Sequence, residues 1–496
     1  MVKQEYFPSW APSTARDADW ERPLDAVEIF YRRMTPKGAG CYPVTACASV
    51  NISSDPETSD FCFKSAWTIL RREYPPLGSR VSFDPANVTW MRRYSQLDTA
   101  AESAWLSSTF LVVENEEGPE HWFNNAPPAF ELSSLFLVKP RGEDANYTVF
   151  LRCPHDLTDG VGTLHLLNRF LLHAGAIHEH GQHYASTVLL PEDESSALSP
   201  SLQVDAMFPS KPSLSLQDTF KGTISNNGAI YNHPGLLSLP ASSAANDQEG
   251  THRAAVSIPL PTSCQIVDAC KSIGPGISVT HVFLAGLAQT LAELQPQRDE
   301  PYEVRYANQF LMDLRPQLPA PFDGPKHAAA AYSTVSAQAM NLDLVAGAQG
   351  AAAKLEEFRR CAIDARDFFH AVRPTSLDHE QVQLTPLVFN SLADQAGPNP
   401  HATSDPAFCP VALSSLGVLD KVASSRHGSL TVDNVWVASE PIGAGVAAFL
   451  GSWAGKMELS VVFRKDYHDV EYLEDFLGRI VDNVLLGLNI GEPFCL

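Results

Sequence analysis

The sequence predicts an α/β protein made of two lobes, each a mixed sheet with helices. Strand-like and helix-like patterns alternate in both halves of the chain, which favours α/β lobes. The 496 residues are too many for one hydrophobic core, so two or three domains are expected. Pro, Ser, Asn and Gly dominate residues 190–250, which show little periodicity. We therefore expect an N-terminal lobe over 1–195, a long crossover linker over 196–253 and a C-terminal lobe over 254–496.

The elements of the N-terminal lobe follow from local residue patterns. Apolar residues at helical spacing indicate helices. Runs of β-branched and aromatic residues between turn formers indicate strands. On these grounds we expect helices over 20–34, 61–74 and 161–172, and strands over 46–52, 105–114, 132–138 and 147–153.

The C-terminal lobe shows the same two kinds of pattern. The clearest helix begins after Ser278 or Thr280, either of which can cap it, and continues with apolar residues to Leu294. We expect helices over 261–272, 278–294, 351–369 and 470–488, and strands over 254–260, 302–314, 410–416, 430–437 and 456–463.

Composition limits the kinds of partner. The net charge is −22, from 35 Lys and Arg against 57 Asp and Glu, which argues against a nucleic-acid or membrane surface. A few local basic residues can still bind an anionic coenzyme. The first six residues show no apolar leader, no apolar run is long enough to span a membrane, and nine Cys are scattered without paired spacing. We expect a cytoplasmic monomer with free thiols.

Cys153-Pro154-His155-Asp156-Leu157-Thr158-Asp159-Gly160 is the segment that carries chemistry. It lies between an expected strand and an expected helix, where a scaffold can aim a side chain into a cleft. His155 suits proton transfer near neutral pH, and a hydroxyl becomes a good nucleophile only when such a base removes its proton. A tight turn can place Asp159 behind the loop, where an ion pair with an Arg would fix its geometry. Gly160 suits a turn with an unusual backbone angle or close packing.

This run resembles the His-x-x-x-Asp-Gly signature of the chloramphenicol acetyltransferase-like superfamily, which includes condensation domains, plant-type alcohol acyltransferases and fungal trichothecene O-acetyltransferases. Condensation domains usually have two His in a row, but Pro154 takes the first place here. The plant-type Asp-Phe-Gly-Trp-Gly motif is absent, and the pattern around 20–24 resembles the trichothecene branch. Further segments resemble the superfamily in the expected order: 278–285, 308–315, 414–417 and 455–459.

The resemblance implies two chloramphenicol acetyltransferase-like lobes and a role for each matched residue. His155 matches the catalytic base, Asp159 the structural acid, Gly160 the turn glycine and Arg315 the partner of that acid across the lobes. The implied reaction transfers an acyl group directly from acyl-coenzyme A, a co-substrate, to a small-molecule alcohol acceptor. It requires neither a metal nor a bound cofactor. Ser415 is the candidate donor to the oxyanion.

Other interpretations remain open. The same fold can serve a condensation-type or cyclising enzyme of secondary metabolism, with an amine acceptor, a carrier-protein donor or non-acyl chemistry. A catalytically silent binding protein would be expected to lack His155. The run 178–183 suggests a metal site, but Gln182 replaces the second His of a zinc-protease box, so a solvated loop is favoured. Cys153 is better interpreted as a small buried residue than as a nucleophile.

Overall fold

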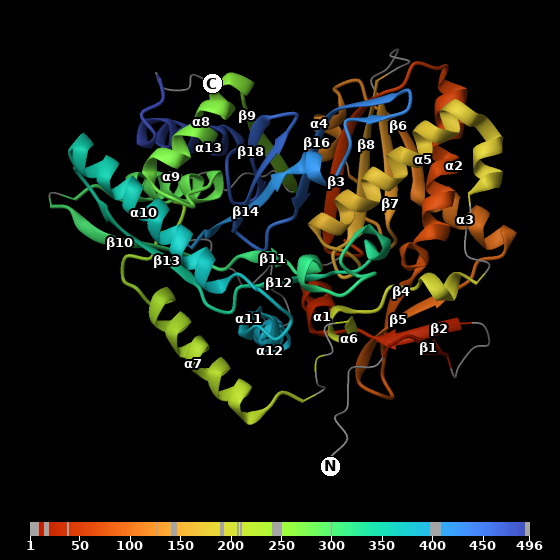
Figure 1. Ribbon diagram of the computed structural model, residues 1–496, viewed down its shortest axis with the longest axis horizontal. Coiled ribbons are helices and arrows are strands. Elements are labelled where there is room, and N and C mark those ends of the chain that lie inside the picture. Colours follow the sequence, from red (N-terminus) through yellow and green to blue (C-terminus); the bar gives the residue numbers. More distant parts are fainter. Residues whose placement is uncertain are drawn as a thin grey trace.

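The computed structural model describes residues 9–13, 19–36, 39–125, 127–139, 146–188, 193–205, 208, 211–240, 250–298, 300–396 and 408–491. The N-terminal hexapeptide and parts of the expected linker (206–207, 209–210 and 241–249) lie outside this range. Two lobes lie side by side (Figure 1), each with its own sheet and helices. The predicted α/β fold with two lobes is therefore confirmed. Within the described part of the chain, no helix is both long and apolar enough to cross a membrane.

The first lobe is built on a six-stranded sheet. Its strands, in spatial order, are β15 (Arg426–His427), β16 (Leu430–Ser439), β3 (Pro43–Asn51), β8 (Asn146–Pro154), β7 (Ser134–Lys139) and β6 (Phe110–Glu114). Helices α2 (Pro56–Glu73) and α5 (Gly160–Thr187) pack on one face and α4 (Pro119–Asn125) on the other. Because both faces are covered, eight of the nine residues of β8 are buried, including the polar residues Thr148 and Arg152.

The second lobe contains a four-stranded sheet. Its strands, in spatial order, are β14 (Val411–Val418), β17 (Val446–Trp453), β18 (Lys456–Arg464) and β9 (Thr251–Ile258). Around it lie α8 (Leu260–Ile273), α9 (Val279–Glu293), α10 (Ala351–Val372), α13 (Val470–Gly487) and the pair β10 (Tyr302–Asn308) and β13 (Met340–Ala346). Helix α9 is buried continuously from His281 to Ala292, so it forms the centre of this core.

A third apolar cluster joins the two lobes near the N-terminus. It is formed mainly by α1 (Ala26–Arg33), α12 (Thr385–Ala396) and the segment around Tyr332. The remaining elements are β1 (Ala11–Pro12), β2 (Asp19–Pro23), β4 (Arg80–Asp84), β5 (Thr89–Ser95), α3 (Thr99–Thr109), α6 (Leu202–Asp205), α7 (Leu214–Tyr231), β11 (Leu311–Asp313), β12 (Ser333–Val335), α11 (Glu380–Gln383) and five short 3₁₀ turns: Pro75–Gly78, Glu194–Ala197, Arg315–Gln317, Pro325–His327 and Leu419–Lys421.

The structure corrects several expected elements. The strand expected over 105–114 begins only at Phe110, because the preceding residues complete α3. The strand expected over 302–314 is two strands, β10 and β11, and the helix expected over 20–34 is β2 followed by α1. The expected linker contains α7, a helix of 18 residues, and β17 lies where no strand was expected.

One strand crosses between the lobes. Strand β16, blue in Figure 1, pairs antiparallel with β3 along most of its length, although it comes from the C-terminal part of the chain. The expected boundary at 254 therefore does not separate the two sheets, because the sheet of the first lobe includes a strand from the C-terminal side of that boundary. The crossing of β16 into the first lobe places its C-terminal end beside the start of β3. The start of β3 in turn pairs with the end of β8, where the His155 loop begins.

Candidate active site

His155 stands at the end of β8, in the loop that leads to α5. Its backbone N–H donates to the carbonyl oxygen of Tyr42 at 2.7 Å, which continues the pairing of β8 with β3 by one residue. Asp159 is the N-cap residue of α5. The strand fixes one end of this four-residue loop and the helix cap fixes the other, so the position of His155 is set by rigid elements.

The imidazole of His155 packs against two aromatic rings. The ring of Tyr31, from α1, stacks on it at 3.7 Å between centroids and 10° between planes. The ring centroid of Tyr42 lies 5.9 Å from that of His155. Only 5% of His155 is exposed, and Nδ1 is buried without a hydrogen-bond partner among the described residues. Burial lowers the pKa of His155 to about 4, although the Asp159 carboxylate acts in the opposite direction. The imidazole is therefore neutral at physiological pH and able to accept a proton.

Asp159 is directed into a set of donors behind the loop. Its Oδ1 accepts from the backbone N–H of Gly162 at 2.8 Å, and its Oδ2 from that of Tyr332 at 2.7 Å. Nη1 of Arg315 lies 2.9 Å from both carboxylate oxygens. The ion pair expected from the sequence is thus present, and it ties the loop to the segment that follows β11. Every lone-pair direction of this carboxylate faces a donor, which leaves it poorly placed to take a proton from a substrate.

Arg315 is held from three sides. Besides Asp159, its guanidinium donates to Asp313 Oδ1 at 3.0 Å and to the carbonyl oxygen of Ala330 at 2.9 Å. Burial opposes its charge, but the two carboxylates raise the pKa of Arg315 above its ordinary value. The guanidinium therefore remains charged inside the protein and fixes the geometry of the loop.

The glycine that this geometry requires is Gly162 and not Gly160. Gly160 does not have a positive φ, and a Cβ there would meet Val437 at 3.4 Å, an ordinary contact. A Cβ on Gly162 would lie 2.3 Å from Thr158 Oγ1 and 2.5 Å from the carbonyl oxygen of Ala328. No expectation from the sequence included Gly162. The spacing of two glycines around Val161 was the only available signal.

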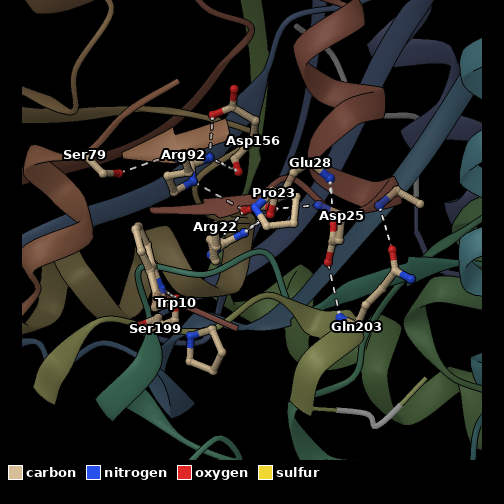
Figure 2. Close-up of polar contacts among 12 residues, drawn as sticks. Trp10, Arg22, Pro23, Asp25, Glu28, Ser79, Arg92, Asp156, Ser199 and Gln203 are labelled. Atoms are coloured by element: carbon tan, nitrogen blue, oxygen red, sulfur yellow. Dashed lines mark hydrogen bonds and ion pairs between the residues drawn. The ribbon is translucent and has the colours of Figure 1, made fainter. Parts of the chain in front are cut away.

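A second buried network holds the loop on its other side (Figure 2). Arg92, from β5, donates through Nη2 to the carbonyl oxygen of Asp156 at 2.6 Å and lies 3.2 Å from its Oδ1. Nε of Arg92 is 3.5 Å from Glu28, which is paired with Arg22. The residue next to His155 is therefore connected to α1 and β2. No sequence pattern indicated this network, because its members are far apart along the chain.

Ser415 lies on β14, exposed, and its hydroxyl is paired with Thr280 Oγ1 at 2.8 Å, at the start of α9. The neighbouring residue Leu416 lies nearer the loop, with Cδ2 4.0 Å from the position that a Cβ on Gly160 would take. A cavity of about 250 Å³ opens beside these residues, between the sheets of the two lobes. Its lining includes Leu416, Trp436, Val437, Phe449 and Trp453.

The other candidates from the sequence lie elsewhere. Cys153 is fully buried on the face of the sheet covered by α2 and α5, and burial raises the pKa of its thiol to about 12, which argues against a nucleophile. In the run 178–183, which belongs to α5, the ring of His178 pairs with Ser429 at 2.6 Å. Across the described ranges, no three His, Cys, Asp or Glu side chains gather in a way that would hold a metal ion.

No family model matches the sequence. Among curated proteins, the chain is similar to "Acetyltransferase pigO" of Monascus ruber, with 24% identity over 334 residues. This alignment covers 63% of the chain and 65% of the relative, so the chain spans just under two thirds of that protein's length.

Solved structures share the fold along nearly the whole chain. TRI3 trichothecene 15-O-acetyltransferase of Fusarium sporotrichioides matches with a TM-score of 0.75 and 17% identity, over 98% of this chain and 99% of that one. The EpoB cyclization-docking bidomain of Sorangium cellulosum matches with a TM-score of 0.58 and 13% identity, over 99% and 90%. The condensation domain of the monacolin K polyketide synthase MokA matches with a TM-score of 0.55 and 13% identity, over 95% of this chain and 98% of that one.

The chain therefore shares the two-lobed fold of TRI3 and of the EpoB and MokA domains. This confirms the fold that the resemblance of the His155 motif and the later segments implied. At these identities the likeness defines the fold, and the reaction has to be argued from the site.

Proposed function

We propose that the protein is an acyltransferase that moves an acyl group from a coenzyme A thioester to a hydroxyl of a small natural product. His155 is the general base. The observation that carries this proposal is a buried imidazole at the end of β8, in a loop held on both sides by buried Arg–Asp contacts. The likeness to an acetyltransferase of Monascus ruber and to the TRI3 fold supports the same chemistry.

The proposed reaction needs no covalent enzyme intermediate. His155 takes the proton of the acceptor hydroxyl, and the oxygen attacks the thioester carbonyl carbon. The tetrahedral intermediate collapses as the C–S bond breaks, and the imidazolium returns its proton to the departing thiolate. Asp159 and Arg315 hold the loop and take no proton. The oxyanion needs a donor, and Ser415, through its hydroxyl beside Thr280, remains our candidate.

The test is a comparison of two histidine variants with purified protein, acetyl-coenzyme A and a panel of alcohol acceptors. His155→Ala should lower kcat by about a hundred- to ten-thousand-fold, the usual size of a lost general base. His165→Ala is the matched control, since His165 lies on α5, burial likewise lowers its pKa to about 4, and it has no place in the proposed reaction. Near-native turnover of His155→Ala with unchanged circular dichroism would eliminate the proposed mechanism.

A second candidate is a condensation-type or cyclising enzyme with a carrier-protein donor or an amine acceptor. The likeness to the EpoB and MokA domains favours it, whereas Pro154 in place of a first His argues against it. Paired assays with acyl-coenzyme A and acyl-carrier protein, each with alcohol and amine acceptors, separate the two. A cytoplasmic location and a monomeric state are further predictions, testable by fractionation and by light scattering.

A further inference from the structure

Helix α1 brings an aromatic side chain directly against the proposed base. Its start is fixed by a capping box in which Asp25 accepts from the backbone N–H of Glu28 and Glu28 accepts from that of Asp25, both at 3.0 Å. Tyr31 follows on the buried face of the helix and is 4% exposed. Its ring covers the imidazole of His155 in a nearly parallel stack at 3.7 Å. The first turn of α1 therefore sets where this ring stands.

The same helix is locked to the His155 loop by buried charges (Figure 2). Glu28 accepts from Nη1 and Nη2 of Arg22 at 2.6 and 2.7 Å. Arg92 lies between Glu28 and Asp156 and bonds to the backbone of the residue next to His155. Four charged side chains, each no more than 4% exposed, are costly to bury in this way. Their effect is to hold α1 and the loop in one fixed relation.

Each carboxylate of the His155 loop has an arginine partner. Asp156 and Asp159 belong to its own loop, and each is paired with an arginine from another element, Arg92 and Arg315 respectively. Tyr42 is the other titratable side chain beside the ring, and its hydroxyl donates to the backbone of Glu440. The face of the imidazole is therefore covered by an aromatic surface, whose electron-rich face favours a stacked cation.

We propose that Tyr31 is a positioning residue for His155: its ring fixes the plane of the imidazole and stabilises the imidazolium formed during acyl transfer, while the Arg22–Glu28–Arg92–Asp156 network keeps α1 in place. This inference rests on the proposed role of His155. The face of the Tyr31 ring contacts the imidazole. The hydroxyl of Tyr31 has no part in this contact, because it is buried without a hydrogen-bond partner among the described residues.

Three variants on one helix test the proposal by kinetics. Tyr31→Phe keeps the ring and should keep kcat within about threefold. Tyr31→Leu removes it and should lower kcat about tenfold or more, with a smaller change in KM, since a lost cation–aromatic contact acts on the charged state. Phe30→Leu is the matched control for loss of a neighbouring ring, because Phe30 packs on Tyr31 at 5.2 Å and on Phe389 of α12 at 5.4 Å but makes no ring contact with His155. If kcat falls as far in Tyr31→Phe as in Tyr31→Leu, or if it falls equally in Phe30→Leu, the proposal is wrong.

A second measurement does not depend on turnover. In protein labelled with ¹³C-histidine, the His155 signal is the one that disappears in His155→Ala. A stacked tyrosine ring shifts that signal upfield. We expect the shift to persist in Tyr31→Phe, to vanish in Tyr31→Leu and in Tyr31→Met, which fills the space without a ring, and to shrink in Glu28→Gln. The pKa of His155 read from its titration should fall when the ring is lost.

The two measurements separate the two proposals. A full upfield shift in Tyr31→Leu or Tyr31→Met would overturn the stacking role, and a full shift in Glu28→Gln would overturn the role of the network. If His155→Ala remains active while the shifts behave as expected, the proposed function fails and the stacking stands. Tyr31→Met keeps the test decisive if Tyr31→Leu does not fold.

Discussion

Replacing Asp159 by Asn removes the carboxylate that faces Arg315, Gly162 and Tyr332 together. The asparagine oxygen can still cap α5, but its NH2 group then faces an N–H donor. Both partners are buried, so breaking the pair should cost about 3–5 kcal/mol of unfolding free energy. Arg315→Met keeps the aliphatic part of the side chain and removes the charge. Arg315→Met should lower the free energy of unfolding less than Asp159→Asn does, because two backbone N–H groups still hold the Asp159 carboxylate.

The assay is urea unfolding of the wild type, the two single variants and the double variant, followed by fluorescence and far-UV circular dichroism. The double variant should be more stable than the sum of the single losses predicts, by about 1–3 kcal/mol, as for residues in direct contact. Asp313→Asn is the matched control. It contacts the same guanidinium at 3.0 Å, but its side chain is 29% exposed, so it should cost less than about 1 kcal/mol. Losses that add within about 0.5 kcal/mol, or an equal loss in Asp313→Asn, would refute the reasoning.

Two further predictions concern the same loop, and a third concerns metals. Gly162→Ala should destabilise the protein by about 1–3 kcal/mol through overlap with the carbonyl oxygen of Ala328, whereas Gly160→Ala should change the melting temperature little. Burial lowers the pKa of His155 to about 4 from 6.5, so the unfolded chain binds a proton that the folded protein does not. Stability should therefore be complete above pH 6.5 and fall towards pH 4, by up to about 3 kcal/mol from this group, and the fall should be smaller in His155→Gln. Activity should survive dialysis against a chelator, and loss with recovery on adding zinc would favour the 178–183 run instead.

The position of His155 could be predicted because both neighbours of its loop have strong local patterns. Strand β8 is buried on both faces and contains a run of aromatic and β-branched residues from Tyr147 to Phe150, and α5 carries Leu164, Leu167 and Phe170 at helical spacing. Helix α7 could not be found in this way. Within α7, which the structure describes in full, only Asn227 is buried, and Leu216 and Phe220, four residues apart, are only partly buried, so its apolar stripe is too short and too exposed to mark it.

Other features depend on contacts between distant segments. The aromatic residues of 105–114 favour a strand, but Asp98 caps α3, and the helix continues through Trp105 to Thr109. The stack of Tyr31 on His155 and the contact of Arg92 with Asp156 join separate elements, and no local pattern encodes them. Gly160 was assigned the role of Gly162 because spacing alone does not show where a Cβ would meet a neighbour.

The exchange of β16 has a consequence for biosynthesis. When the first lobe emerges from the ribosome, β3 is paired with β8 on one side only, because β16 is made after most of the second lobe. Strand β3 has nine residues, seven of them buried in the finished fold, and an open edge of this kind pairs readily with other chains. Nascent chains halted before residue 430 should therefore be prone to aggregate and should depend on chaperones. The sheet that carries His155 is complete only after the ribosome has synthesised β16, which ends at Ser439.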